Sequence, residues 1–140
     1  MKQILMILLL SIVWVSPTLT YAEVWVIVNQ YNQVDAMEKS EVTGLYLGRY
    51  LSFRDGSAAH PLDQDKDGSV YEAFYQRLTG KSAAYINAYW AQILFTGRAK
   101  PPKEILTEAE LIKAVRQDRN AIGYVNAGAS LQGVKVVLRL

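Results

Sequence analysis

The stretch from residue 60 to residue 69 holds the side chains whose types and spacing could carry chemistry. Asp67, Gly68 and Ser69 stand directly before a predicted helix. The free backbone N–H groups and the positive dipole end of a helix start can hold an oxyanion, and the hydroxyl of Ser69 would add a donor. Three aspartates and one lysine precede this position, so an anion would also meet negative charge. Gly68 and Ser69 are therefore the candidate ligand-binding residues.

The same stretch matches the first half of a calcium-binding loop. Asp63, Asp65 and Asp67 supply oxygen atoms at alternate positions, and a glycine stands sixth. Position twelve should supply a bidentate carboxylate but is Phe74, and Glu72 lies two residues too early on the predicted helix. We therefore expect a solvated acidic turn with Asp67 as the helix cap, in preference to a calcium site.

Catalytic groups are scarce in this sequence. The chain has no cysteine, which excludes disulfides, thiolate metal sites and a cysteine nucleophile. Its one histidine, His60, cannot build the usual zinc site alone, and no serine can be named as its partner in a triad. We expect His60 at the surface or at the edge of the core. The sequence thus predicts a protein that is not an enzyme and that uses no metal or cofactor.

Length and composition restrict the class of protein. A chain of 140 residues allows one domain, and 51% hydrophobic with 20% charged residues is typical of a chain that buries a core. There are 15 basic and 13 acidic side chains, and loss of Lys2 with a leader would bring the two counts to within one of each other. This balance argues against nucleic-acid binding, which needs a basic face.

The first 22 residues have the pattern of a secretory signal peptide. Lys2 supplies the positive start, Ile4 to Val15 is apolar at all but one position, and Thr20-Tyr21-Ala22 places small residues at the two positions that a signal peptidase reads. Cleavage is predicted before Glu23. A bilayer needs about 20 apolar residues, so this run is too short for stable membrane insertion. Residues 23–140 are expected to be periplasmic or secreted.

The remaining sequence alternates between strand and helix patterns. Glu23 to Asn29 is an almost unbroken β-branched and aromatic run, which is typical of a strand covered on both faces. Other predicted elements are a helix capped by Ser40, a brief strand at Ala58 to Leu62, helices over Ser69 to Leu78, Ser82 to Phe95 and from Thr107, and strands over Ala121 to Val125 and Val134 to Leu140. This order predicts one α/β domain, a small and mostly buried sheet of about four strands with about four flanking helices.

Within the predicted helix over 82–95, apolar residues recur at three- and four-residue intervals: Tyr85, Ile86, Tyr89, Trp90, Ile93 and Leu94. We expect this side of the helix to face the core. Stacking of a ligand on Tyr89 or Trp90 is the alternative.

A basic loop follows this helix. Arg98, Lys100 and Lys103 bracket the extended link at Pro101-Pro102. They could meet an anionic partner, and a solvated loop explains them as well.

A series of short stretches occurs in an order and spacing typical of one known family: Lys39 to Arg49, Phe53 to Gly56, Phe74 to Gly80, Tyr89-Trp90, Phe95 to Gly97, Pro101-Pro102 and Ala121 to Val125. Together they cover nearly all of residues 23–140. They resemble the small periplasmic-binding-protein-like domains related to the phosphate-binding components of ABC transporters.

The resemblance implies an extracytoplasmic α/β domain like one lobe of a two-lobed solute receptor. In such receptors the anion lies between the lobes, held by serine and threonine hydroxyls, helix N-terminal amides and an arginine. The family's serine-glycine-threonine element falls on Asp67-Gly68-Ser69, so the resemblance assigns a role only to Gly68 and Ser69. Where the family has an arginine upstream, this chain has Asp63-Gln64-Asp65.

Two hypotheses follow. The first is a binding module for phosphate or another oxyanion, which pairs two copies or docks on a partner lobe and works with a membrane permease or a sensor protein. The second is a ligand-free interaction or accessory domain that keeps the fold and has exchanged the anion site for an acidic turn.

Overall fold

The structure, a computed structural model, describes residues 22–140, so the predicted signal peptide lies outside the described residues except for Ala22. The elements in chain order are β1 (Val24–Asn29), α1 (Lys39–Tyr46), β2 (His60–Asp63), α2 (Ser69–Thr79), α3 (Ala83–Thr96), β3 (Lys103–Glu104), α4 (Glu108–Gln117), β4 (Ala121–Asn126) and β5 (Val134–Arg139). Among these residues no helix has the length and apolar character that crossing a membrane requires.

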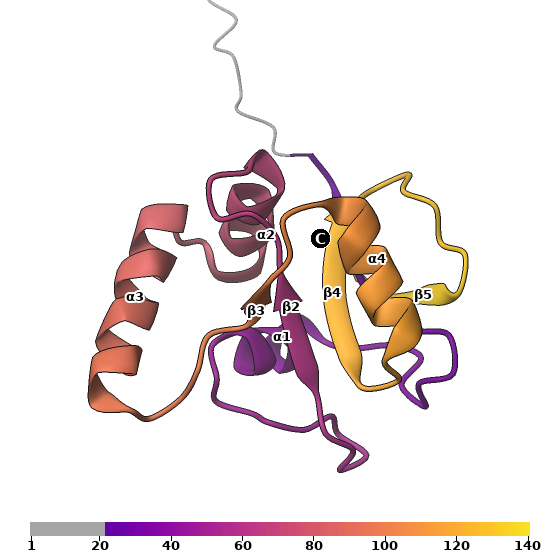
Figure 1. The fold of residues 1–140 in the computed structure, drawn as a ribbon, viewed down its shortest axis with the longest axis horizontal. Helices are drawn as coiled ribbons and strands as arrows, with labels where there is room; N and C mark the ends of the chain where they lie inside the picture. The colour runs from indigo at the N-terminus through magenta and orange to yellow at the C-terminus, as the bar shows by residue number, and fades with distance from the viewer. Residues whose placement is uncertain (1–21) are drawn as a thin grey trace, which may run out of the picture.

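The strands form one mixed sheet in the order β3-β2-β4-β1-β5. Strand β2 is parallel to both β3 and β4, whereas β1 is antiparallel to β4 and β5. The carboxyl ends of β2, β3 and β4 therefore lie at one edge of the sheet, which we call the carboxyl edge. Helix α2 follows β2 and α4 follows β3, so both helices begin at this edge, in the upper part of Figure 1.

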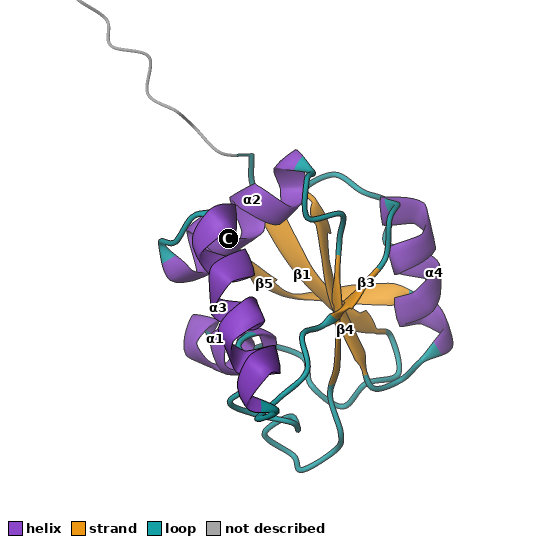
Figure 2. Ribbon diagram, turned by 60° about the vertical axis from the view of Figure 1, so that its left-hand side comes forward, coloured by secondary structure: helices purple, strands orange, loops and turns teal. Residues whose placement is uncertain are grey.

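Helices cover both faces of the sheet. Helices α1, α2 and α3 lie on one side and α4 lies on the other (Figure 2). Along β1, Val24, Val26 and Val28 belong to the core under α1–α3, and Ile27 belongs to the core under α4. This alternation confirms the prediction of a strand buried on both faces, since each face needs its own apolar set.

Helix α4 packs closely on β4 because Gly123 lies beneath it. A Cβ atom at Gly123 would lie 2.6 Å from Cδ2 of Leu111 and 3.2 Å from Cγ2 of Val115. The side-chain amide of Asn29, buried at the end of β1, donates to the carbonyls of Val115 and Arg116 at 3.0 and 2.8 Å. These bonds satisfy carbonyls in the last turn of α4, which have no partner inside the helix.

Two helix starts show one wrong and one correct prediction. Helix α1 is capped by Glu38, not by Ser40: the Glu38 side chain accepts from the N3 amide, and Glu41 accepts from the Glu38 amide at 2.7 Å. Ser40 already lies within the helix, because this reciprocal pair starts it earlier. The start of α4 at its N-cap residue Thr107 is as predicted, and the Thr107 hydroxyl caps the helix by accepting from the Glu110 amide at 3.2 Å.

The sheet has five strands, one more than expected, because β3 pairs with the end of β2. Only two pairs form, Leu62 with Lys103 and Asp63 with Glu104. The sequence predicts an extended link at Pro101-Pro102, and β3 follows directly after these prolines. A two-residue strand carries no alternation that could reveal it.

Most of the predicted side of α3 faces the core: Ile86 and Trp90 belong to the core cluster, Tyr89 and Ile93 pack against it, and only Tyr85 and Leu94 of the predicted set do not. Ile86 and Trp90 are buried, but Tyr85 and Leu94 are 53% and 52% exposed and Phe95 is 95% exposed. Helix α3 packs against α2 and lies at the periphery, not over the sheet (Figure 1), so only a narrow side of it is covered. Trp90 belongs to the core cluster, which leaves its ring no open face for stacking a ligand.

The close approach of α4 to β4 leads to a stability prediction. Gly123→Ala should lower the free energy of unfolding by about 1–3 kcal/mol, because the added methyl group must displace Leu111. Urea denaturation of both proteins measures this loss. In a Leu111→Ala background, Gly123→Ala should lower the free energy of unfolding by clearly less. An equal loss of unfolding free energy in the two backgrounds would contradict the contact between residue 123 and Leu111.

Candidate functional site

The start of α2 lies at the carboxyl edge, directly after β2. A tight turn joins them, in which the Gly68 amide donates to the Asp65 carbonyl at 2.9 Å and the Asp67 amide donates to Oδ1 of Asp65 at 3.0 Å. The predicted cap Asp67 is wrong: Gly68 is the N-cap residue, with φ −83° and ψ 151°, and no side chain caps the helix. Asp67 is held inside the turn, one position too early to cap.

The absence of a cap leaves amides open at this end. The amide of Glu72 is the first to bond within the helix, to the Gly68 carbonyl at 3.4 Å. Among the described residues no acceptor partners the amides of Ser69, Val70 or Tyr71. Ser69 is exposed. The structure thus places both sequence-predicted residues, Gly68 and Ser69, at an uncapped helix start, where donors for an anion converge.

The charges around this helix start are mostly negative. Asp65 and Asp67 lie in the turn, Glu72 lies in the first turn of α2, and Glu104 of β3 accepts from the Lys66 amide at 3.3 Å. Lys66 is the one cation of the turn. An anion at α2 would therefore gain from the amides and lose from the carboxylates.

The first aspartate of the calcium-like pattern points into the protein. Asp63 is 2% exposed, and its Oδ1 and Oδ2 accept from the hydroxyls of Tyr124 and Tyr75 at 2.6 and 2.8 Å. Burial raises the pKa of Asp63 to about 7, although both tyrosine hydroxyls act to lower it. Because this carboxyl group faces the core, it is not available to an ion at the loop. Within residues 22–140 no group of three or more acidic, histidine or cysteine side chains could hold a metal.

A cluster of buried aromatic rings surrounds Asp63. The rings of Phe74 and Tyr124 stack at 3.7 Å, and Tyr46 meets both edge-on, with its hydroxyl 2.9 Å from the Leu62 carbonyl. The Gln64 side-chain amide donates to the Tyr124 carbonyl at 2.7 Å. This network was not predicted from the sequence. The available signal was the presence of tyrosines in otherwise apolar segments, since a buried hydroxyl needs a polar partner.

His60 lies at the surface, as expected. It begins β2 and is therefore at the end of the strand opposite the carboxyl edge. Its Nδ1 lies 2.7 Å from Oδ2 of Asp118. Partial burial acts to raise the pKa of Asp118, but hydrogen bonds with His60 and the Asn120 amide outweigh it and lower that pKa. The pair joins β2 to the residues that precede β4, and it does not reach α2.

Two adjoining hollows lie elsewhere, beside α1. They have volumes of about 600 and 320 Å³ and share Met37, Glu41, Phe53 and Arg54 as lining residues. Glu41 and Arg54 form an ion pair of 2.7 Å at this position. Neither hollow is lined by Gly68 or Ser69, so the candidate site is an open surface at the helix start and not part of these hollows.

The fold is similar to about half of several solved phosphate transport receptors. It superposes on an ABC-type phosphate transport receptor from Vibrio cholerae with a TM-score of 0.64 and 15% identity, covering 84% of this chain and 47% of the receptor. A putative phosphate ABC transporter substrate-binding protein with bound phosphate from Clostridium perfringens superposes with a TM-score of 0.62 and 16% identity. The superposition covers 84% of this chain and 45% of that protein.

A third solved structure, PstS from Borrelia burgdorferi, gives a TM-score of 0.63 and 11% identity over 83% of this chain and 47% of that protein. The chain therefore spans less than half the length of these receptors. No protein-family model matches the sequence, and no curated protein matches it. The comparisons define the fold, and they confirm the single-lobe α/β architecture expected from the sequence.

The buried carboxyl group predicts a pH dependence of stability. Asp63 has a higher pKa when folded, about 7, than the roughly 3.9 of an exposed aspartate, so the folded state holds this proton more tightly. Its stabilising contribution is complete below about pH 4 and is lost as the pH rises to about 7. We expect Asp63→Asn to gain melting temperature relative to wild type between pH 5 and pH 8, measured by calorimetry.

Asp65→Asn is the control for this measurement, because Asp65 lies in the solvated turn. It should leave the slope of melting temperature against pH as in the wild type. A parallel pH profile for the wild type and Asp63→Asn would show that Asp63 titrates like an exposed carboxyl group.

Proposed function

We propose that residues 23–140 form an extracytoplasmic binding module that holds an oxyanion, phosphate in the first place, at the start of α2. The observation that carries this proposal is the uncapped helix start, with the free amides of Ser69, Val70 and Tyr71 beside the Ser69 hydroxyl. Such an arrangement supplies several N–H donors and one O–H donor to a tetrahedral anion. Its place at the carboxyl edge supports the proposal, since ligands of open α/β sheets bind outside the carboxyl ends of strands.

The start of α4, the other helix that begins at this edge, already has hydrogen-bond partners within the lobe. The Thr107 hydroxyl caps α4, and Glu108 accepts from the Asn126 amide at 2.7 Å. The α2 start is therefore the open donor group at this edge. An anion resting there stays uncovered on its outer side by residues 22–140, so the proposed site needs a second wall that this lobe does not supply, such as another copy of the chain or a partner lobe.

The second candidate function is the ligand-free interaction domain. The carboxylates of Asp65, Asp67 and Glu104 favour it, because they oppose anion binding at α2. The two candidates differ in one measurable property. Only the binding module gains stability from phosphate.

The proposed function includes export of the protein and a partner protein at the membrane. The pattern of residues 1–22 supports export to the periplasm or secretion, followed by signal removal. The receptors with this fold are named for ABC transport of phosphate, which supports a permease or a sensor protein as the partner. We propose no enzymatic activity, cofactor or nucleic-acid partner for the module.

Binding of phosphate can be measured as thermal stabilisation. At a concentration ten times its dissociation constant, phosphate should stabilise the native state by about 1.4 kcal/mol. For a domain of this size that is a rise in melting temperature of about 4 °C or more. Ser69→Ala should reduce the rise, because one donor is lost, and Asp65→Asn combined with Asp67→Asn should increase it, because repulsion is removed.

Ser130→Ala serves as the matched control, since Ser130 lies in the loop between β4 and β5. Chloride at equal ionic strength separates specific binding from salt effects. The proposal fails if millimolar phosphate gives no rise in either the wild type or the double aspartate variant, and the ligand-free candidate then stands.

A further inference from the structure

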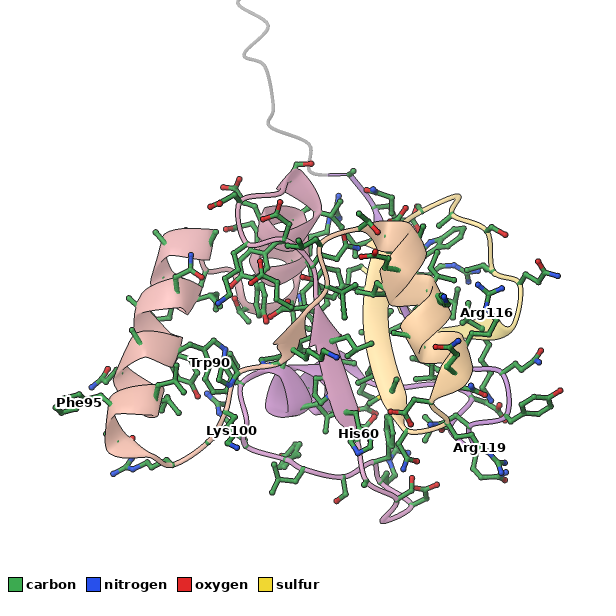
Figure 3. All side chains as sticks on the ribbon, in the orientation of Figure 1. His60, Trp90, Phe95, Lys100, Arg116 and Arg119 are labelled. Carbon is green, nitrogen blue, oxygen red and sulfur yellow. The ribbon has the colours of Figure 1, made fainter. Side chains whose placement is uncertain are left out.

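A second surface combines exposed apolar side chains with cations. It consists of Leu94, Phe95, Arg98 and Lys100, which form the last turn of α3 and the loop after it; we call it the α3 tip. Leu94 is 52% exposed, Phe95 is 95% exposed, and both cations are exposed. In Figure 3 Phe95 points away from the body of the protein, on the side remote from α4. An aromatic side chain this exposed gains nothing from the folded core.

The outward face of α3, which adjoins this tip, carries no charged residue. The helix has no charged residue between Ala83 and Thr96. At helical spacing, Ala84, Ala88, Ala91 and Phe95 are all exposed. A surface helix of an isolated globular protein usually carries charged residues on this face.

The cations of this region are unusually concentrated. Residues 81–103 contain Lys81, Arg98, Lys100 and Lys103 and no acidic residue. Of the 15 basic side chains, Lys2 lies outside the described residues and four lie in this segment. The other ten basic side chains share the rest of the described chain with all 13 acidic side chains. Residues 81–103 therefore form a positive segment, whereas the rest of residues 22–140 carries a net negative charge.

None of these four cations forms an ion pair with another residue of the range 22–140. The ion pairs among the described residues join Glu41 to Arg54, His60 to Asp118, and Asp35 to Lys135. Lys81 makes a cation–π contact with Tyr85 at 5.0 Å, which leaves its charge intact. The charges of the α3 tip remain available to an anionic counterpart.

We infer that the α3 tip docks on an anionic lipid membrane surface. Phe95 and Leu94 enter the boundary between headgroups and acyl chains, and Arg98 and Lys100 contact the anionic headgroups beside them. The contact is peripheral and reversible, and it orients the carboxyl edge away from the bilayer. It is independent of the oxyanion proposal, because no residue is shared.

Dimerisation through α3 explains the exposed apolar and basic residues of this surface less well than a lipid membrane does. Either orientation would bring Lys81, Arg98 and Lys100 of two copies together with no carboxylate to offset them. The face of this 14-residue helix is a strip about 21 Å long and 10 Å wide, far below the roughly 800 Å² per partner of a stable interface. A lipid surface needs no shaped counterpart and supplies apolar and anionic layers together.

Vesicle co-sedimentation tests the inference with residues 23–140, which hold every described element and both core clusters. We expect binding to vesicles of about three parts phosphatidylcholine to one part phosphatidylglycerol, weakened by salt, and little binding to pure phosphatidylcholine. Arg98→Gln with Lys100→Gln should reduce the partition coefficient about 25-fold, at roughly fivefold per cation. Phe95→Ser should reduce it at least about tenfold.

Matched control variants remove exposed cations or an exposed apolar side chain outside the α3 tip. Lys39→Gln with Lys113→Gln removes two exposed cations, and Leu106→Ser removes a side chain that is 70% exposed. Both should bind like the wild type, and circular dichroism verifies that every variant is folded. The inference is overturned by equal partition onto both vesicle types, by absence of binding, or by equal losses in the controls. Absence of vesicle binding would leave an acidic protein surface as the counterpart.

Discussion

The position of the candidate site depends on one buried interaction, the carboxyl group of Asp63 between the hydroxyls of Tyr75 and Tyr124. Asp63 ends β2, Tyr75 belongs to α2 and Tyr124 belongs to β4, so a single side chain joins three elements at 2.6 and 2.8 Å. A buried carboxyl group is costly unless such partners surround it. Because the chain has only a tight turn between Asp63 and Ser69, fixing the end of β2 also fixes where α2 begins and where its free amides point.

Much of this architecture follows from patterns in the sequence. Apolar runs with strand or helix periodicity located β1, β4, β5 and the helices, and the resemblance indicated a single receptor lobe, which the solved structures confirm at the level of the fold. The failures have local causes. Ser40 and Asp67 have good capping side chains, but a reciprocal glutamate pair and a turn closed by Asp65 displaced them by one or two positions. The tyrosines in apolar segments indicated that buried polar partners exist, but the sequence does not identify Asp63 as that partner, because it lies 12 and 61 residues from Tyr75 and Tyr124.

The molecule is electrostatically divided. The carboxyl edge gathers Asp65, Asp67 and Glu104 around an uncapped helix start, whereas residues 81–103 carry only cations. The amide donors attract an anion over a few ångströms, and the carboxylates repel it over a longer range that salt shortens. In the proposed function, this competition makes the start of α2 a weak site for an anion, and its affinity rises when a second wall excludes water and supplies a cation.

The central claim is that the start of α2 binds an oxyanion through its own backbone. An NMR titration of ¹⁵N-labelled residues 23–140 with phosphate, at constant ionic strength, observes these amides one by one. The account predicts saturable shifts centred on the amides of Ser69, Val70 and Tyr71, with the β5 amides unchanged. Shifts confined to Arg98 and Lys100, or no saturable shift at Ser69, would contradict it.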